Sequence, residues 1–272
     1  MDAVTLNNDA LIIERVLEHI AVKENEPHRH LLGQFVMVKC GVLHGHTPEQ
    51  HWLMKPGMAV WIPPDTVHWG KAHSRVDLTV LYIAPTLSSS LTSQVKLIDT
   101  SFLISALCER LADAAAPLSE KRRNSMLQLL FEEIEEKPAS NLTLPLPKDI
   151  RLKRVTDSLI ADPAQRLSLA EWGHLVGATE RTLARLFRKE TGLRYTDWHN
   201  RLLLAVAWQG LASGTTNEQL SVMLGFSSGD SFGHWFRRVA GNRPGQVRKY
   251  LLDQQHVLTP QNCPFGSIEC DL

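Results

Sequence analysis

The segment VGATERTLARLFRKETG at residues 176–192 recurs, with changes, as LGFSSGDSFGHWFRRVAG at residues 224–241. Gly177 aligns with Gly225 at an offset of 48 residues, and Phe187 aligns with Phe236 at an offset of 49 after one inserted residue. An internal repeat with this period indicates that one unit of supersecondary structure occurs twice in the chain.

Both copies have the pattern of a helix that follows a tight turn. A glycine is followed by a residue that can cap a helix, Thr179 or Ser228. Apolar residues then recur at i, i+3 and i+4, which is the spacing of one buried helix face. These stripes are Leu183, Leu186 and Phe187 in the first copy and Phe232, Trp235, Phe236 and Val239 in the second.

A short amphipathic stretch precedes each glycine, at residues 167–176 and 217–224. Each copy therefore predicts a helix-turn-helix, at about 167–190 and 217–240. Residues 195–211 contain no proline and are rich in leucine and alanine, which predicts one helix of about 25 Å between the copies. Such a connector would hold two helices near the roughly 34 Å that separates successive major-groove segments on one side of a duplex.

The polar faces of the two second helices are the predicted DNA-binding surface. Arg181, Arg185 and Arg188 recur at i, i+4 and i+7, and arginine can make bidentate contacts with guanine. The second copy is less basic, so we expect it mainly to hold phosphates. Ordinary surface charges on a helical bundle are the alternative, but the duplication favours DNA binding. The predicted contacts are Thr179, Glu180, Arg181, Thr182, Arg185, Arg188, Lys189, Ser228, Asp230, Ser231, His234, Arg237 and Arg238.

The region from about residue 151 to residue 250 resembles the DNA-binding domain of the AraC/XylS-type transcription regulators. The resemblance lies in TERTLARLF at 179–187, ETG at 190–192, LGF at 224–226 and the Gly-x-x-Pro of 241–244. It implies double-stranded promoter DNA as the partner. The sequence departs from the family at Ser221, where alanine is usual, at Arg243, where threonine is usual, and at Leu203, where arginine is frequent.

The charge distribution supports this interpretation. The whole chain carries 29 Lys plus Arg and 29 Asp plus Glu. Residues 149–252 contain 15 basic and 9 acidic residues, whereas residues 1–148 contain 14 and 17, and residues 253–272 contain none and 3. The basic excess therefore lies where the repeats lie, as expected for a nucleic-acid partner.

The first part of the chain contains the short apolar runs of β-strands, such as QFVMVKCGVL, MAVWIP and LTVLYI. Two segments, PHRHLLGQ at 27–34 and PGMAVWIPPDTVH at 56–68, resemble the signature regions of the cupin fold. That resemblance implies a small antiparallel barrel with His28, His30 and His68 at its mouth. Gln34 stands where metal-binding cupins usually have glutamate, so we predict no metal cofactor and keep the three histidines as the alternative metal ligands.

Instead we expect these histidines to form hydrogen bonds at the barrel mouth or to recognise a small-molecule effector. Trp61 lies within an apolar run and is expected in the core, whereas Trp52 and Trp69 adjoin polar residues and could line a pocket. The loops are expected to hold His44, His46, His51 and His73. The predicted effector-binding residues are His28, His30, Gln34, Trp52, His68 and Trp69.

Two helices are predicted between the domains, at 95–111 and 121–136. The second has Leu127, Leu130, Phe131 and Ile134 at i, i+3, i+4 and i+7. Such a pair either packs on its own barrel or forms a homodimer interface, and we favour the dimer. The proline-rich stretch at 137–149 is the predicted interdomain linker.

The predicted domains are a cupin-like sensor at 1–86, a helical dimerisation and linker region at 87–148, an AraC-type DNA-binding domain at 149–252, and a tail at 253–272. The fold class is α+β: a cupin-like antiparallel β-barrel, a helical pair, and an all-α domain with two helix-turn-helix motifs. The scattered cysteines Cys40, Cys108, Cys263 and Cys270 suggest reduced thiols. No apolar run approaches the roughly 18 residues of a membrane span and no charged leader is evident, which predicts a cytoplasmic protein.

The predicted function is a non-enzymatic, sequence-specific transcription regulator. The two cupin-like segments and residues 180–187 further resemble a subgroup that includes the repressor of a neighbouring efflux-transporter gene, which favours repression of a transporter or metabolic gene. A metal-dependent cupin enzyme with an accessory helical domain, or a helical module that binds protein rather than DNA, remain the alternatives.

Overall fold

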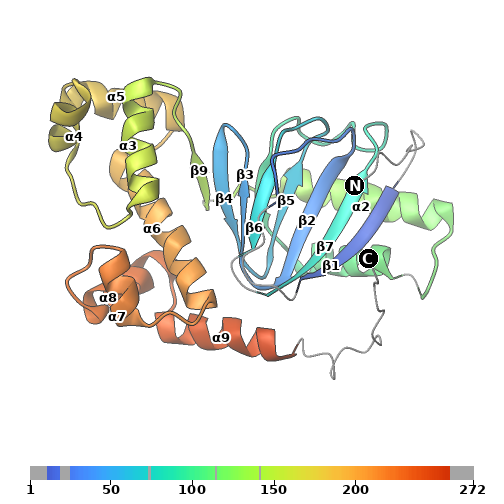
Figure 1. The fold of residues 1–272 in the computed structure, drawn as a ribbon. Helices are drawn as coiled ribbons and strands as arrows, with labels where there is room; N and C mark the ends of the chain where they lie inside the picture. The colour runs from blue at the N-terminus through green and yellow to red at the C-terminus, as the bar shows by residue number, and fades with distance from the viewer. Residues whose placement is uncertain (1–10, 19–24, 73–74, 114, 141, 258–272) are drawn as a thin grey trace.

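The computed structural model describes residues 11–18, 25–72, 75–113, 115–140 and 142–257. His73, Cys263 and Cys270 lie outside these ranges. Two antiparallel sheets form the first part of the molecule (Figure 1), with strand orders β1-β7-β2-β5-β8 and β6-β3-β4-β9. The strands are β1 (Leu11–Glu18), β2 (Gly33–Cys40), β3 (Leu43–His46), β4 (Gln50–Met54), β5 (Met58–Ile62), β6 (Trp69–Ala72), β7 (Val76–Ile83), β8 (Lys96–Asp99) and β9 (Thr143–Pro145).

The apolar runs of the sequence are the central strands of the five-stranded sheet, as predicted. They lack the usual alternation of apolar and polar residues because both faces of this sheet are covered. On β2, Phe35 and Met37 pack toward helices, whereas Val36 and Val38 pack toward the four-stranded sheet. The predicted core residue Trp61 is fully buried on the helical side. The antiparallel α+β fold predicted from the sequence is confirmed.

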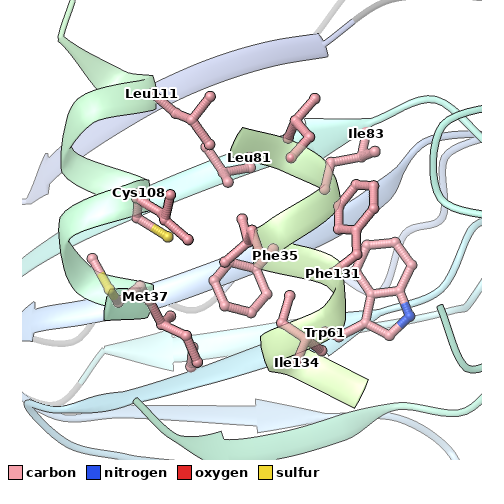
Figure 2. Packing of buried hydrophobic residues seen from close by; sticks show 14 of the residues in the cluster. Phe35, Met37, Trp61, Leu81, Ile83, Cys108, Leu111, Phe131 and Ile134 are labelled. Atoms are coloured by element: carbon pink, nitrogen blue, oxygen red, sulfur yellow. The ribbon is translucent and has the colours of Figure 1, made fainter. Parts of the chain in front are cut away.

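Helices α1 (Phe102–Ala112) and α2 (Glu120–Glu136) cover the outer face of the five-stranded sheet. The predicted apolar stripe of α2 is buried there, and Figure 2 shows Phe131 and Ile134 beside Phe35 and Trp61. The helix predicted at 95–111 is wrong in its first part, because residues 96–99 form β8. Leu97 and Ile98 on that strand point into opposite cores, a period of two that overrides the helical interpretation.

The remaining helices form the second part of the molecule and agree closely with the predicted repeats. Gly177 and Gly225 both adopt left-handed backbone angles, with φ of 71° and 68°, at the turns between paired helices. Val239 was predicted on the buried stripe but is 39% exposed, so the stripe ends one turn earlier. The helices are α3 (Ile150–Ala161), α4 (Leu169–Val176), α5 (Glu180–Thr191), α6 (Tyr195–Ala212), α7 (Asn217–Met223), α8 (Gly229–Ala240) and α9 (Pro244–Val257).

The two parts of the molecule share packing. Strand β9, which lies within the predicted linker, pairs with β4 and immediately precedes α3. Val42, between β2 and β3, and Leu53 on β4 belong to the same buried cluster as Leu203 and Trp208 of α6. Leu203, one of the departures from the family pattern, is therefore a core residue. Among the described helices, none is both long and apolar enough to cross a membrane.

Candidate nucleic-acid interface and histidine cluster

Helix α5 presents one buried face and one polar face. Thr179 is its N-cap, and its hydroxyl accepts a hydrogen bond from the Thr182 backbone N–H at 3.2 Å. Leu183, Leu186 and Phe187 are buried, as the apolar stripe predicted. The polar residues predicted to touch DNA are exposed, apart from the half-buried Thr182; they are Thr179, Glu180, Arg181, Arg185, Arg188 and Lys189. The geometry therefore leaves three arginines on consecutive turns of one solvent face.

Helix α8 repeats this construction with different chemistry. Ser228 caps it, and the Ser231 backbone N–H donates to the Ser228 hydroxyl at 3.1 Å. The Nδ1 atom of His234 lies 2.9 Å from the carbonyl oxygen of Asp230, which can only accept, so Nδ1 carries the proton in this hydrogen bond. Ser231 is half-buried, while the other residues predicted to touch DNA are exposed: Ser228, Asp230, His234, Arg237 and Arg238.

The two turns are closed by the same backbone bond. Ala178 N–H donates to the carbonyl of Gly173 at 2.9 Å, and Phe226 N–H donates to the carbonyl of Ser221 at 2.7 Å. Ser221 is buried, and its hydroxyl donates to the carbonyl of Glu218 at 2.7 Å. A serine at this position is therefore satisfied, and the departure from the family does not disturb the second motif.

Arg166 joins the two motifs and was not predicted from the sequence. Its guanidinium donates to the carbonyl oxygens of Leu224 and Gly225, which end α7, and stacks 4.6 Å from the centre of the Phe226 ring. Basic groups suit the negative C-terminal end of a helix. Together with α6, which connects the two motifs (Figure 1), this contact fixes α8 relative to the first motif.

The second candidate site is formed by His28, His30 and His68. His28 and His68 form an antiparallel bridge, with backbone N–H···O distances of 3.1 and 2.9 Å, so their side chains project from the same face. His30, two residues further along, lies on that side too, and its ring centroid is 5.1 Å from that of His68. The two segments precede β2 and β6 rather than lying within a strand, but the predicted convergence of the three rings is present.

The hydrogen bonds of these rings define their tautomers. Each Nδ1 atom lies 2.7–2.8 Å from a backbone carbonyl oxygen, which can only accept, so each Nδ1 carries the proton. The acceptors belong to Glu26, Leu32 and Thr66. Burial lowers the pKa of His68 to about 4 and lowers the pKa of His30. Both rings are therefore neutral near pH 7, with lone pairs on Nε2.

The other predicted effector residues differ in their burial and contacts. Gln34 is half-buried on β2, and Trp52 is buried at 4% exposure in the core between the sheets. Trp69 stacks on His46 with ring centroids 5.3 Å apart, and His46 lies 4.3 Å from His51. The prediction that His44, His46 and His51 lie in loops is wrong, because they belong to β3 and β4.

Two family models match this chain. One, described as a helix-turn-helix domain, matches residues 172–250, and the other, described as an AraC-like ligand binding domain, matches residues 13–144. Together they span most of the chain.

Curated transcription regulators are similar to this chain in sequence. The HTH-type transcriptional regulator NimR of Escherichia coli is 29% identical over 80% of this chain and 80% of its own length. The HTH-type transcriptional regulator RipA of Corynebacterium diphtheriae is 28% identical over 57% of this chain and 46% of its own. The match to a crystal structure of ToxT from Vibrio cholerae covers 89% of this chain and 97% of that one at 12% identity, with a TM-score of 0.37. The alternative of a metal-dependent enzyme finds no support among these relatives.

Proposed function

Because this chain belongs to the AraC family of DNA-binding transcription regulators and resembles its NimR-like subgroup, we propose that it represses a neighbouring transporter or metabolic gene in response to a small-molecule effector. In this proposal residues 149–252 bind the promoter and the sheets with α1 and α2 receive the effector. The role requires the cytoplasmic location predicted from the sequence.

The observation that carries the DNA-binding part is the polar face of α5. Arg181, Arg185 and Arg188 lie exposed on that face while the opposite stripe is buried, so their guanidinium groups are available to base edges and phosphates. At 18 residues, α6 spans about 27 Å. This length suits two recognition helices in successive major-groove segments, with α5 reading bases and α8 mainly holding phosphates.

The proposal that an effector controls DNA binding is supported by the packing between the sheets and the helical half of the chain. A ligand shifts an equilibrium only by its differential affinity for the two states. The sheets and α6 share one buried cluster, and β9 leads directly into α3. A ligand that changes the packing of the sheets therefore acts on elements that hold α5 and α8.

We further propose that a second copy of the chain packs against α1 and α2. Phe102 is 91% exposed at the start of α1, and Leu103 and Leu129 are also partly exposed. Exposed apolar side chains on both helices of a pair are typical of an interaction surface. The buried stripe of α2 is already used against the sheet, so only the outer face of the pair can serve a dimer.

Footprinting of the DNA upstream of the protein's own gene tests the central proposal. We expect protection of two adjacent major-groove segments per chain, with affinity that falls steeply as salt rises because phosphate contacts release counterions. Association with little salt dependence and no protected sequence would support a protein-binding module instead. Transcription from the footprinted promoter in vitro then separates repression from activation.

Light scattering of purified protein tests the dimer. We expect the mass of two chains for the wild type and a shift toward one chain for Phe102→Ser. Ser125 on the exposed side of α2 offers a matched control, since Ser125→Ala removes no apolar surface. A monomeric wild type would reject the proposed interface without affecting the DNA-binding proposal.

A further inference from the structure

We propose that His28, His30 and His68 form a binding site for a divalent transition-metal ion of the nickel, copper or zinc type. One nitrogen from each ring lies within 4.8 Å of the others, and this is a cluster of three potential ligands among the described residues. Neutral imidazole nitrogens are preferred ligands for these metals.

The hydrogen bonds prepare the three rings for a metal. Each Nδ1–H is held by a backbone carbonyl, which fixes the ring orientation and leaves Nε2 as the lone-pair donor. Metal-binding histidines nearly always donate their other ring N–H to such an acceptor. Three rings with the same arrangement are difficult to explain as a chance feature of the turn.

The orphaned nitrogens point to the same ligand. The Nε2 atoms of His30 and His68 are buried and have no hydrogen-bond partner among the residues that the structure describes. A buried polar atom without a partner is destabilising, and its presence suggests a missing ion or ligand. Because these atoms are acceptors, an anion does not suit them, whereas a metal ion accepts all three lone pairs at once.

The geometry requires only small adjustments. With metal–nitrogen bonds of about 2.0–2.1 Å, tetrahedral coordination places the nitrogens about 3.3 Å apart. The present separations of up to 4.8 Å would have to shorten, and His28 is the member best placed to shift, because it is exposed whereas the other two rings are more buried. Three protein ligands leave one position of a four-coordinate ion open.

The site would join the two sheets. His28 and His30 lead into β2 of the five-stranded sheet, and His68 immediately precedes β6 of the four-stranded sheet. A bound ion would therefore connect these segments at one end of the sheets and stabilise the folded protein by mass action. This inference concerns metal binding alone and does not depend on the protein's acting as a repressor.

The test uses the full-length, untagged protein stripped with a chelator. Co²⁺ is titrated while the visible d–d absorption, which reports low-coordinate cobalt, is recorded. The metal content after Zn²⁺ loading and gel filtration gives the stoichiometry. We expect one equivalent per chain and a higher thermal midpoint in the presence of Zn²⁺. Less than half an equivalent would overturn the proposal.

Two variants and a control locate the ion. His28→Ala alters an exposed side chain and His68→Gln keeps the buried volume, so at least one should fold with a wild-type far-ultraviolet spectrum. We expect each folded variant to bind Zn²⁺ at least about tenfold more weakly. His174→Ala on α4, an exposed histidine outside the cluster, should bind as the wild type does. Unchanged binding in the cluster variants, or thiolate-to-cobalt charge-transfer bands that point to cysteine ligands, would overturn the assignment.

Discussion

The two helix-turn-helix motifs share a backbone but differ in what surrounds it. Both have a left-handed glycine at the turn, a hydroxyl cap on the second helix and the same closing bond. The first turn is open to solvent at Gly177, whereas Gly225 of the second is packed against Ala164 and the turn is held by Arg166. Repeated sequence therefore predicts a repeated fold, but the contacts outside the repeat decide how each copy is used.

The largest expected difference between the copies concerns their turn glycines. A Cβ at Gly225 would overlap the carbonyl oxygen of Ala164, whereas a Cβ at Gly177 meets no atom within 4 Å. Both alanine variants incur the left-handed penalty of about 1–2 kcal/mol, and overlap raises the loss of stability for Gly225→Ala to about 3 kcal/mol. Thermal unfolding of the two variants should rank them in this order. Equal midpoints would show that the second turn is no more constrained than the first.

The next prediction concerns recognition. Arg181→Ala or Arg185→Ala should weaken binding to the cognate site by about 1–3 kcal/mol if the guanidinium contacts a guanine. His234→Ala on α8 should reduce the affinity by less, because that copy is expected mainly to hold phosphates. Fluorescence anisotropy with cognate and scrambled duplexes measures both effects. If His234→Ala caused the larger loss of discrimination, the assignment of the reading helix would be reversed.

A third prediction concerns how much Arg166 contributes to the stability of the second motif. Replacing it with alanine removes charge-assisted hydrogen bonds to two carbonyls at the end of α7, each worth about 1.5–3 kcal/mol when buried. Since Arg166 is partly exposed, we expect a net loss of about 1–2 kcal/mol in the free energy of unfolding. Urea denaturation measures this, with Arg154→Ala as the control because Arg154 is exposed on α3. Equal losses in the two variants would contradict the proposed role of Arg166 in holding the second motif.

The smallest effect is expected for phosphate contacts. Arg237→Ala should weaken binding to all duplexes alike and reduce the slope of log affinity against log salt by about 1. Arg188→Ala, at a similar place on α5, provides the matched measurement in the first copy. A sequence-dependent loss for Arg237→Ala would indicate that α8 also reads bases.

Local signals in the sequence predicted helices α4 to α8 to within a few residues, whereas α3 and α9 were not predicted. The caps, glycines and apolar spacing that define α4 to α8 all lie within one or two turns of each other, so neighbouring residues suffice. Arg166 was missed because its carbonyl acceptors lie 58 and 59 residues away. The residues next to Arg166 in the sequence give no sign of this role.

The sheet half was predicted in class but not in detail. The strands β8 and β9 were assigned to a helix and a linker because their partners, β5 and β4, are distant in the sequence. The histidine cluster could be predicted in part, since His28 and His30 are two residues apart. The third histidine, His68, is 40 residues from His28 and is brought to it by a backbone bridge. Each Nδ1–H donates to a backbone carbonyl in a local turn, and the sequence pattern does not predict these turns.

Strand β9 has a further consequence for engineering. When two domains are joined only by a flexible linker, either domain can be exchanged, because separating them exposes little apolar surface. In this chain, a chimera joined after residue 148 with a foreign reading domain would keep β9 but expose Val42 and Leu53, which are covered by α6. The carbonyls of Pro145 and Thr143 on β9 would also lose their donors, which are the side chains of Trp198 and Arg201 on α6. The two halves of this chain therefore depend on each other's packing, and exchanging one of them exposes part of this shared core.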